Sequence, residues 1–416
     1  QQLLEKAGYE IVPFEEGADI YLINTCTVTN IADRKSRQML HKAKKMNPNA
    51  IVVATGCYVQ TDTQKLEEDS AVDLILGNNQ KKQIVEALEE YEKEHTKKVK
   101  VIEINKTKEY EDLSIGYTAE HVRAYIKVQD GCNQFCTYCI IPYARGRVRS
   151  RKIAEVLDEV RALAARGYKE VVLTGIHLSS CGVDFKEEER ESLLSLIQAV
   201  HEVEGIQRIR LGSLEPRIIT EEFMEGISSL PKVCPHFHLS LQSGCDKTLR
   251  NMNRRYSAAE YAEKCELIRK FYPAPALTTD VIVGFPMETE EDFEDSYEFV
   301  KNIHFYETHI FKYSRRQGTK AAAMNGQLTE AVKAQRSEKM LKLHEIRAKE
   351  YETSMIGRTL ELLLEEEVEI GGKTYFMAHS KEYVRAVIEK TDAHKVNDLV
   401  KAKAVDFADE HVLLAI

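Results

Sequence analysis

The chain lacks several features that would place it in a specialised class. It has no run of about 18 apolar residues, which excludes a membrane-spanning helix. It shows no secretory signal, although it begins at Gln1 and not at Met. It also lacks an excess of positive charge, because 67 acidic side chains outnumber 58 basic ones. A nucleic-acid partner would therefore need a local basic patch. We expect a cytoplasmic protein of two or three domains.

The cysteine content argues against a disulfide scaffold. Nine cysteines are spread over 416 residues, and the chain carries no secretion signal. Large chains of this kind keep their thiols reduced and use them for metal binding or catalysis. The cysteines are therefore candidate metal ligands or catalytic groups.

Residues 1–95 alternate apolar runs with helical patterns. The runs ADIYLINT, AIVVATG and VDLILG are typical of buried strands, and amphipathic segments follow them. This alternation predicts a doubly wound α/β domain. The opening QQLLEKAGYE resembles the end of a helix, so the strand that should precede it is missing from the sequence. The polar residues 96–117 are interpreted as a linker.

Two further domains follow. Residues 118–352 contain six strand candidates, most of them followed by a helical stretch, which predicts a partial (β/α)6 barrel that is open on one side. In such barrels the chemistry sits at the carboxyl ends of the strands. Residues 353–416 contain short strands separated by turn signals, which predicts a small β-barrel.

Three cysteines cluster directly after the first strand of the central domain. In GCNQFCTYC, the residues Cys132, Cys136 and Cys139 follow the spacing C-x3-C-x2-C. Three thiolates can hold three irons of a 4Fe-4S cluster and leave the fourth iron open for another ligand. The alternative is a zinc site with a distant fourth ligand, which the absence of a nearby C-x2-C or H-x3-H pair disfavours.

A second pair of cysteines lies in the first domain. Cys26 in INTCTV and Cys57 in ATGCYV each follow an apolar strand, so both should emerge at the ligand-binding edge of the sheet. A single buried cysteine is usually inert. Two at equivalent strand ends favour a site, to which the missing first strand could add a third thiolate.

The cysteine spacing resembles that of the radical S-adenosylmethionine superfamily. The resemblance implies a 4Fe-4S cluster that binds S-adenosylmethionine and cleaves it to a 5′-deoxyadenosyl radical. Tyr138 matches the aromatic residue near the adenine. Positions at later strand ends match the family's other cofactor contacts more loosely: Gly175, Ser240, Gln242, Gly284, Pro286 and Arg315.

Over nearly its whole length the chain looks like the methylthiotransferases. NTCTVTNIADRKSRQ, ATGCYVQ and CTYCIIPYARGRVRSR carry this resemblance. It implies an auxiliary 4Fe-4S cluster on three cysteines of the first domain, of which Cys26 and Cys57 are present, and an RNA-binding terminal barrel of the TRAM type. Two 4Fe-4S clusters and S-adenosylmethionine are thus the expected cofactors, with an unidentified sulfur donor and reductant.

Within that family, NTCTVTNIADRKSRQ and HLSLQSGCDKTLRNMNRRY look most like the branch that acts on N6-threonylcarbamoyladenosine in tRNA. The resemblance implies insertion of a methylthio group at carbon 2 of N6-threonylcarbamoyladenosine next to the anticodon. The alternatives are methylthiolation of isopentenyladenosine in tRNA or of an aspartate in a ribosomal protein. A rival of another class is a non-catalytic iron–sulfur protein that binds RNA or senses redox state.

One basic run could meet RNA. ARGRVRSRK follows the cysteine cluster, and arginine forks suit phosphates and stack on bases. We therefore predict RNA contacts for four arginines: Arg145, Arg147, Arg149 and Arg151. The alternative is a solvated charged segment. In the terminal barrel, Tyr375, Phe376 and Tyr383 are candidates either for base stacking or for packing.

Overall fold

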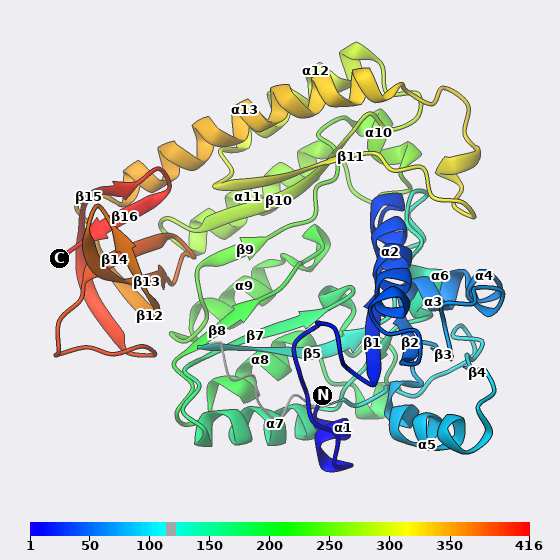
Figure 1. Ribbon diagram of the computed structural model, residues 1–416. Helices are drawn as coiled ribbons and strands as arrows, with labels where there is room; N and C mark the ends of the chain where they lie inside the picture. Colours follow the sequence, from blue (N-terminus) through cyan, green and yellow to red (C-terminus); the bar gives the residue numbers. More distant parts are fainter. Residues whose placement is uncertain (114–121) are drawn as a thin grey trace. The chain divides into compact units, whose positions relative to one another are not determined.

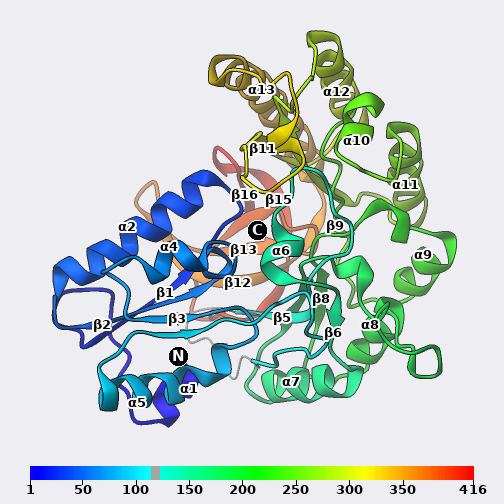
Figure 2. The ribbon, with the colours of Figure 1, turned by 90° about the vertical axis from the view of Figure 1, so that its right-hand side faces the viewer.

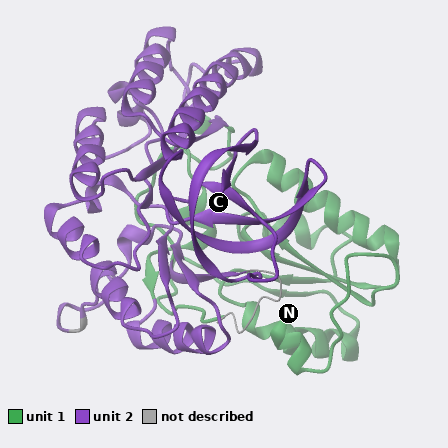
Figure 3. Cartoon of the chain, turned by 90° about the vertical axis from the view of Figure 1, so that its left-hand side faces the viewer, with its two compact units in different colours: residues 1–113, 130–150, 314–323 green, residues 114–129, 151–313, 324–416 purple. Residues whose placement is uncertain are grey.

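The computed structural model describes residues 1–113 and 122–416. The end of the predicted linker and the start of the predicted barrel domain lie outside these residues. The chain forms two compact units (Figure 3). Unit 1 comprises residues 1–113, 130–150 and 314–323, and unit 2 comprises residues 114–129, 151–313 and 324–416. None of the described helices is long and apolar enough to cross a membrane.

Unit 1 is built on a parallel sheet with the strand order β1-β2-β3-β4. The strands are β1 (Ile20–Thr25), β2 (Ile51–Gly56), β3 (Leu74–Leu76) and β4 (Lys98–Lys100). The helices of this segment are α1 (Gln2–Lys6), α2 (Asn30–Met46), α3 (Cys57–Thr61), α4 (Thr63–Glu67) and α5 (Ile84–Glu94).

Both faces of this sheet are covered, as the sequence predicts. Successive residues of a strand point to opposite faces. Val52 packs in a core with Leu40 of α2, whereas its neighbour Val53 packs in a separate core with Leu88 of α5. Figure 2 shows α2 and α5 on opposite sides of the strands. The doubly wound arrangement of the first domain is therefore confirmed.

One part of the predicted linker is not a linker in the structure. Residues 98–100 form β4, which pairs in parallel with β3 and extends the sheet. The strand is short and its side chains are only partly buried. Two of its three residues are lysines, so its composition hides the pairing, which backbone hydrogen bonds provide.

Unit 2 contains six parallel barrel strands. They are β5 (Arg123–Asp130, whose last residue belongs to unit 1), β7 (Glu170–Gly175), β8 (Arg208–Leu211), β9 (His236–His238), β10 (Ala276–Val283) and β11 (Glu307–Lys312). β5, β7 and β8 are neighbours in one sheet and β9, β10 and β11 in another. Parallel bridges from Ile209 to Val233 and from Leu214 to Leu239 join the two sheets. The partial (β/α)6 barrel is therefore confirmed.

Helices cover the outer face of these strands (Figure 2). They are α7 (Ile153–Ala165), α8 (Leu193–His201), α9 (Glu221–Ser228), α10 (Asp246–Asn251), α11 (Ala258–Phe271) and α12 (Glu290–Ile303). Alternation along the strands places Phe237, Leu277 and Val281 in the core beneath the helices. The residues between them face the inside of the barrel.

The long helix α13 (Glu330–Met355) leads to the C-terminal barrel (Figure 1). This barrel is closed, with the strand order β12-β13-β14-β16-β15. Its strands are β12 (Thr359–Ile370), β13 (Lys373–Ser380), β14 (Arg385–Glu389), β15 (Leu399–Asp409) and β16 (Val412–Ala415). Phe376 is 1% exposed in its core and is therefore a packing residue.

A buried ion cluster lies at the amino ends of the first barrel strands. The Glu170 carboxylate of β7 has three arginine partners. Its Oε1 lies 2.9 Å from Arg210 Nε and 3.2 Å from Arg123 Nε, and its Oε2 lies 3.5 Å from Arg208 Nη1. The side chain of Glu170 is fully buried. The pKa of Glu170, which burial alone would raise, is lowered to about 2 by Arg210 and Arg123.

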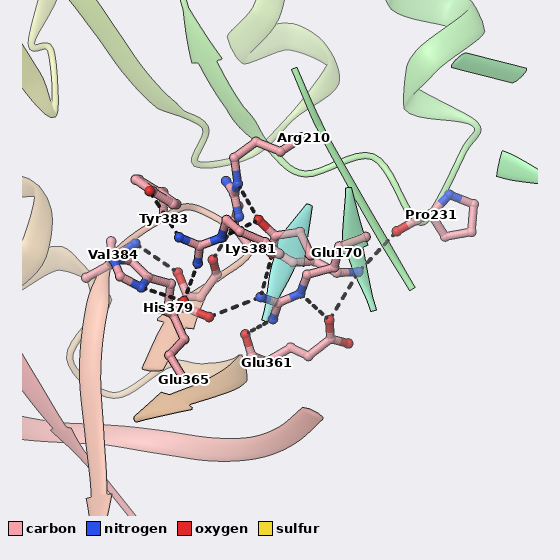
Figure 4. Close-up of polar contacts among 12 residues, drawn as sticks. Glu170, Arg210, Pro231, Glu361, Glu365, His379, Lys381, Tyr383 and Val384 are labelled. Atoms are coloured by element: carbon pink, nitrogen blue, oxygen red, sulfur yellow. Dashed lines mark hydrogen bonds and ion pairs between the residues drawn. The ribbon is translucent and has the colours of Figure 1, made fainter. Parts of the chain in front are cut away.

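The same arginines attach the C-terminal barrel to the partial barrel (Figure 4). Arg123 pairs with Glu365 of β12, and Arg210 donates to the carbonyl oxygen of Lys381 at 3.0 Å. The ring of Tyr383 lies 4.5 Å from the Arg210 guanidinium and 5.0 Å from that of Arg123. In the structure, the Tyr383 ring therefore packs against these two guanidinium groups.

Candidate functional site

The cysteine-rich loop of unit 1, residues 131–140, is called the cluster loop. Gly131 at its start has a φ of +72°, and a Cβ there would lie 1.8 Å from the carbonyl oxygen of Arg147. Only glycine fits at this position. The Cys132 N–H donates to the carbonyl oxygen of Gly146 at 3.0 Å. The cluster loop is thus fixed at its first cysteine by the backbone of residues 146–147.

The rest of the cluster loop is arranged around its three thiols. The Gln134 N–H donates to Cys132 Sγ at 3.4 Å, and the Cys139 N–H donates to the carbonyl oxygen of Cys136 at 3.0 Å. Cys132 is buried, whereas Cys136 and Cys139 are half-buried. Three thiols on one short loop, with an amide that donates to sulfur, fit a cysteine-ligated iron–sulfur cluster.

The second cysteine pair lies at one edge of the unit 1 sheet. Thr25 and Gly56 are paired residues at the ends of β1 and β2, and Cys26 and Cys57 directly follow them. Gly56 has a φ of +101°, and a Cβ there would lie 2.4 Å from the Thr25 carbonyl oxygen. The two strand ends can therefore come this close only with glycine at this position. Cys26 is exposed and Cys57 is buried.

Two distant side chains donate hydrogen bonds to the Cys57 sulfur, and sequence analysis missed both contacts. Arg145 Nε lies 3.1 Å from Cys57 Sγ, and Asn78 Nδ2 lies 3.7 Å from it. Asn78 also donates to the carbonyl oxygen of Ala144 at 2.7 Å. A guanidinium at this position complements the negative charge that a cysteine carries as a metal ligand.

The arginine run has several different roles. Arg149 and Arg151 are only 1% and 4% exposed. Arg149 donates to the carbonyl oxygens of Arg145 and Arg147, and Arg151 pairs with Glu159. Because buried side chains cannot meet phosphates, the predicted RNA contact is not retained for Arg149 and Arg151. Arg147 is exposed, and its guanidinium lies 4.6 Å from the centre of the Phe135 ring.

In unit 2, Gly175 ends β7 beside Gln129 of β5. A Cβ at Gly175 would lie 2.8 Å from Gln129 Oε1. That same oxygen accepts a hydrogen bond from the His177 N–H at 2.7 Å. Gly175 therefore leaves space for a glutamine that orders the loop after β7. Its contact with a cofactor stays a prediction.

The next predicted cofactor residues follow β9. Gln242 has a φ of +74° and is 8% exposed. Its N–H donates to the Asp280 carbonyl oxygen at 2.8 Å, and its own carbonyl oxygen accepts from Ile282. The Ser240 carbonyl oxygen accepts from the Tyr256 hydroxyl at 2.6 Å. These hydrogen bonds hold Ser240 and Gln242 at the carboxyl end of the barrel strands. Cofactor contacts are expected at this end of the strands.

Gly284 and Pro286 lie in the loop after β10. A Cβ on Gly284 would lie 2.3 Å from Lys333 Cγ, and the Gly284 N–H donates to Glu288 Oε1 at 2.9 Å. Glu288 in turn pairs with Arg336 of α13 at 2.6 Å. The loop is thus ordered by α13, and its contact with the adenine stays a prediction.

The remaining two predicted cofactor residues belong to unit 1. Tyr138 is half-buried in the cluster loop, and Arg315 is exposed with its Nε donating to the carbonyl oxygen of Ala322 at 2.9 Å. The predicted cofactor residues are thus divided between the two units. Within unit 1, the segment that carries Arg315 is tied to the first domain by an ion pair of 2.6 Å between Arg316 and Asp33.

Comparison with known families gives two matches. Residues 126–300 match the radical SAM superfamily, and residues 1–77 match the uncharacterized protein family UPF0004. The first match includes the cluster loop and the ends of β7, β9 and β10. The radical SAM family implies a 4Fe-4S cluster and S-adenosylmethionine as cofactors.

Curated relatives match over most of the chain. It is 40% identical to the threonylcarbamoyladenosine tRNA methylthiotransferase MtaB of Bacillus subtilis, over 97% of this chain and 89% of the relative. It is 45% identical to the Aquifex aeolicus protein of the same name, over 86% of this chain and 87% of that protein. The tRNA-2-methylthio-N(6)-dimethylallyladenosine synthase of Thermoanaerobacter pseudethanolicus is 36% identical, over 87% of this chain and 78% of the synthase.

A solved structure shares the fold at low sequence identity. The radical S-adenosylmethionine methyltransferase TsrM of Kitasatospora setae aligns with a TM-score of 0.54 and 16% identity, covering 72% of this chain and 64% of TsrM. The fold, the cysteine spacing and the close relatives agree. This chain belongs to the radical S-adenosylmethionine methylthiotransferase family.

Proposed function

We propose that this protein is a tRNA methylthiotransferase that inserts a methylthio group at carbon 2 of N6-threonylcarbamoyladenosine. The observation that carries the proposal is the identity to the relatives. Two relatives named for the threonylcarbamoyl substrate are 40% and 45% identical to this chain, whereas the dimethylallyladenosine synthase is 36% identical. Because the proposed substrate is a tRNA, we propose that the protein acts in the cytoplasm.

S-adenosylmethionine, when bound, supplies the methyl group and the radical that activates the unreactive C–H bond. The residues of the chain hold and orient these groups. Cys132, Cys136 and Cys139 hold the cluster that binds S-adenosylmethionine. The other residues that we propose as cofactor contacts belong to both units: Tyr138 and Arg315 to unit 1, and Gly175, Ser240, Gln242, Gly284 and Pro286 to the strand ends of unit 2.

We propose further that Cys26 and Cys57 are ligands of a second, auxiliary 4Fe-4S cluster. Their position at one sheet edge supports this role. The contacts of Arg145 and Asn78 with Cys57 Sγ support it as well. In this proposal Arg145 serves the cluster rather than RNA, and exposed Arg147 remains the candidate for an RNA contact.

The substrate is tested with two tRNAs, one carrying threonylcarbamoyladenosine and one carrying isopentenyladenosine. The enzyme, with its clusters reconstituted, is incubated with each tRNA, and the nucleosides are identified by mass spectrometry. We expect methylthiolation of the first tRNA only. A site built for the threonyl carboxylate rejects the apolar analogue, because its polar groups would be left unpaired. Methylthiolation of the isopentenylated tRNA alone would show that the substrate is wrong.

The Cys132→Ala variant is the matched control for chemistry. It should bind tRNA but neither cleave S-adenosylmethionine nor modify the tRNA. If the unmodified protein also fails to cleave S-adenosylmethionine under reducing conditions, the non-catalytic iron–sulfur alternative is favoured.

A further inference from the structure

Three side chains of kinds that bind metals meet on the inner face of the barrel in unit 2, and none of them is among the predicted cofactor residues. They are His238 of β9, Asp280 of β10 and His309 of β11. Within the described part of the chain, one ligand atom from each lies within 4.8 Å of those of the other two. The three strands are neighbours in the order β11-β10-β9.

The strand register explains why these residues meet. Asp280 is directly paired with His309, and His238 is paired with Thr278, two residues before Asp280. Because side chains alternate with a period of two, these residues all point to one face of the sheet. That face is opposite to the core beneath the helices, where Phe237 and Val281 are packed.

His238 and Asp280 are already as far apart as two ligands of one metal ion. His238 Nε2 lies 3.3 Å from Asp280 Oδ2. Nitrogen and oxygen ligands at about 2.0–2.2 Å from a tetrahedral Zn²⁺ are roughly 3.3–3.5 Å apart, so this pair matches one edge of such a site. The His309 side chain is exposed, and its ring is stacked 5.6 Å from that of His238. A shift of at most about 1.5 Å would bring its nitrogen to the same spacing.

The orientation of His238 is fixed by a second contact. Its Nδ1 lies 3.0 Å from the hydroxyl oxygen of Thr278, which is 1% exposed. A metal-bound histidine typically uses its other ring nitrogen in this way, which fixes the tautomer and directs the free nitrogen to the metal. Thr278 therefore leaves Nε2 to face Asp280.

We infer that His238, Asp280 and His309 form a binding site for a divalent first-row transition metal ion. Two imidazoles and one carboxylate suit Zn²⁺ or Fe²⁺, whereas Mg²⁺ and Ca²⁺ prefer oxygen ligands alone. Three protein ligands leave at least one coordination position for water or another oxygen ligand. The exposure of His309 provides a path by which an ion can enter from solvent.

The test uses Zn²⁺ as the probe and the full chain with its iron–sulfur clusters reconstituted. Other metals are first removed with a chelating resin. The affinity for Zn²⁺ is measured by competition with a chromophoric chelator, and iron content is measured before and after. Crystals soaked in Zn²⁺ are then examined by anomalous diffraction just above and just below the zinc edge, because the iron of the clusters scatters anomalously at both energies and zinc strongly at the upper one alone. We expect one zinc-specific difference peak, between the three side chains, and no loss of iron.

Variants distinguish this site from other zinc-binding groups. Thr278→Val should weaken Zn²⁺ binding about 10–100-fold, as loss of an outer-shell partner typically does, and His238→Gln, Asp280→Asn and His309→Gln should each weaken it at least as much. His394→Gln, at an exposed histidine elsewhere in unit 2, is the matched control and should bind as the unmodified protein does. His309 is exposed, so its variant should fold even if a change at Asp280 disturbs the barrel.

The inference is overturned if the three ligand variants bind Zn²⁺ as tightly as the control. It is also overturned if the zinc-specific difference peak lies only at cysteines or is absent at saturating Zn²⁺. In either case, His238 and Asp280 form only an ion pair of the barrel wall. The result does not depend on the tRNA substrate, because no step of the test measures methylthiolation.

Discussion

Replacing Glu170 with Gln removes the carboxylate shared by three buried arginines at the base of unit 2. Gln keeps the size of the side chain, so the change acts mainly on charge. Arg123 and Arg208 retain Glu365 and Glu361 as partners, respectively. Arg210 loses its contact of 2.9 Å with Glu170, and among the described residues it keeps the carbonyl oxygens of Ser380 and Lys381 and the Tyr383 ring.

Two estimates of the magnitude agree. The pKa of Glu170 lies at about 2 in place of the ordinary 4.5. At roughly 1.4 kcal/mol per pH unit, this difference corresponds to about 3 kcal/mol of stabilisation by the arginines. Removing one partner from a buried ion pair typically costs about 3–5 kcal/mol. Because the pKa is lowered on folding, this stabilisation is present above pH 4.5 and is lost as the pH falls from 4.5 to about 2.

The assay is urea denaturation of Glu170→Gln beside the unmodified protein, at equal cluster content and at several pH values. We expect the free energy of unfolding of Glu170→Gln to be about 3 kcal/mol lower than that of the unmodified protein, and this difference should be constant between about pH 6 and pH 8. Glu361→Gln is the control, because Glu361 contacts Arg208 but is 29% exposed. The Glu361→Gln change should lower the free energy of unfolding by less than about 1 kcal/mol. If both variants lose the same small amount, the buried cluster does not stabilise unit 2 as we argue.

Three further predictions concern the proposed cofactor and RNA sites. Replacing the three cluster-loop cysteines with Ala in full-length, reconstituted protein should lower the iron content from about eight to about four per chain; about four irons before the change would contradict a second cluster. Arg145→Ala should make the auxiliary cluster less stable, because it removes a hydrogen-bond donor 3.1 Å from Cys57 Sγ. The electron paramagnetic resonance signal of the radical cluster should persist. Equal iron loss from both clusters would argue for a general structural role of Arg145. Arg147→Ala should weaken tRNA binding and reduce its salt slope by roughly 0.7–0.9 for one lost phosphate contact, whereas Arg161→Ala, an exposed side chain on α7, should leave both unchanged.

The sequence predicted the parts of the fold that depend on periodic apolar residues. Runs such as AIVVATG and TTDVIVGF form β2 and β10, because a strand buried on one or both faces needs such residues. It did not predict β4, whose pairing depends on backbone hydrogen bonds and not on burial.

The candidate site was predicted only as far as strand ends can be located. The common edge of Cys26 and Cys57 follows from the parallel neighbours β1 and β2. The contact of Arg145 with Cys57 does not, because the two residues are 88 positions apart and no local pattern joins them. Burial of Arg149 was missed for the same reason. A basic run looks alike in sequence whether its side chains meet solvent or are enclosed.

The ion cluster also bears on how freely this chain could be shortened or recombined. A chain that ended before β12 would leave Arg123, Arg208 and Arg210 with Glu170, three positive charges against one negative. A chimera that replaced the C-terminal barrel would have to restore carboxylates at the positions of Glu361 and Glu365. Exchange of this barrel between family members therefore requires matching charges where these arginines meet it.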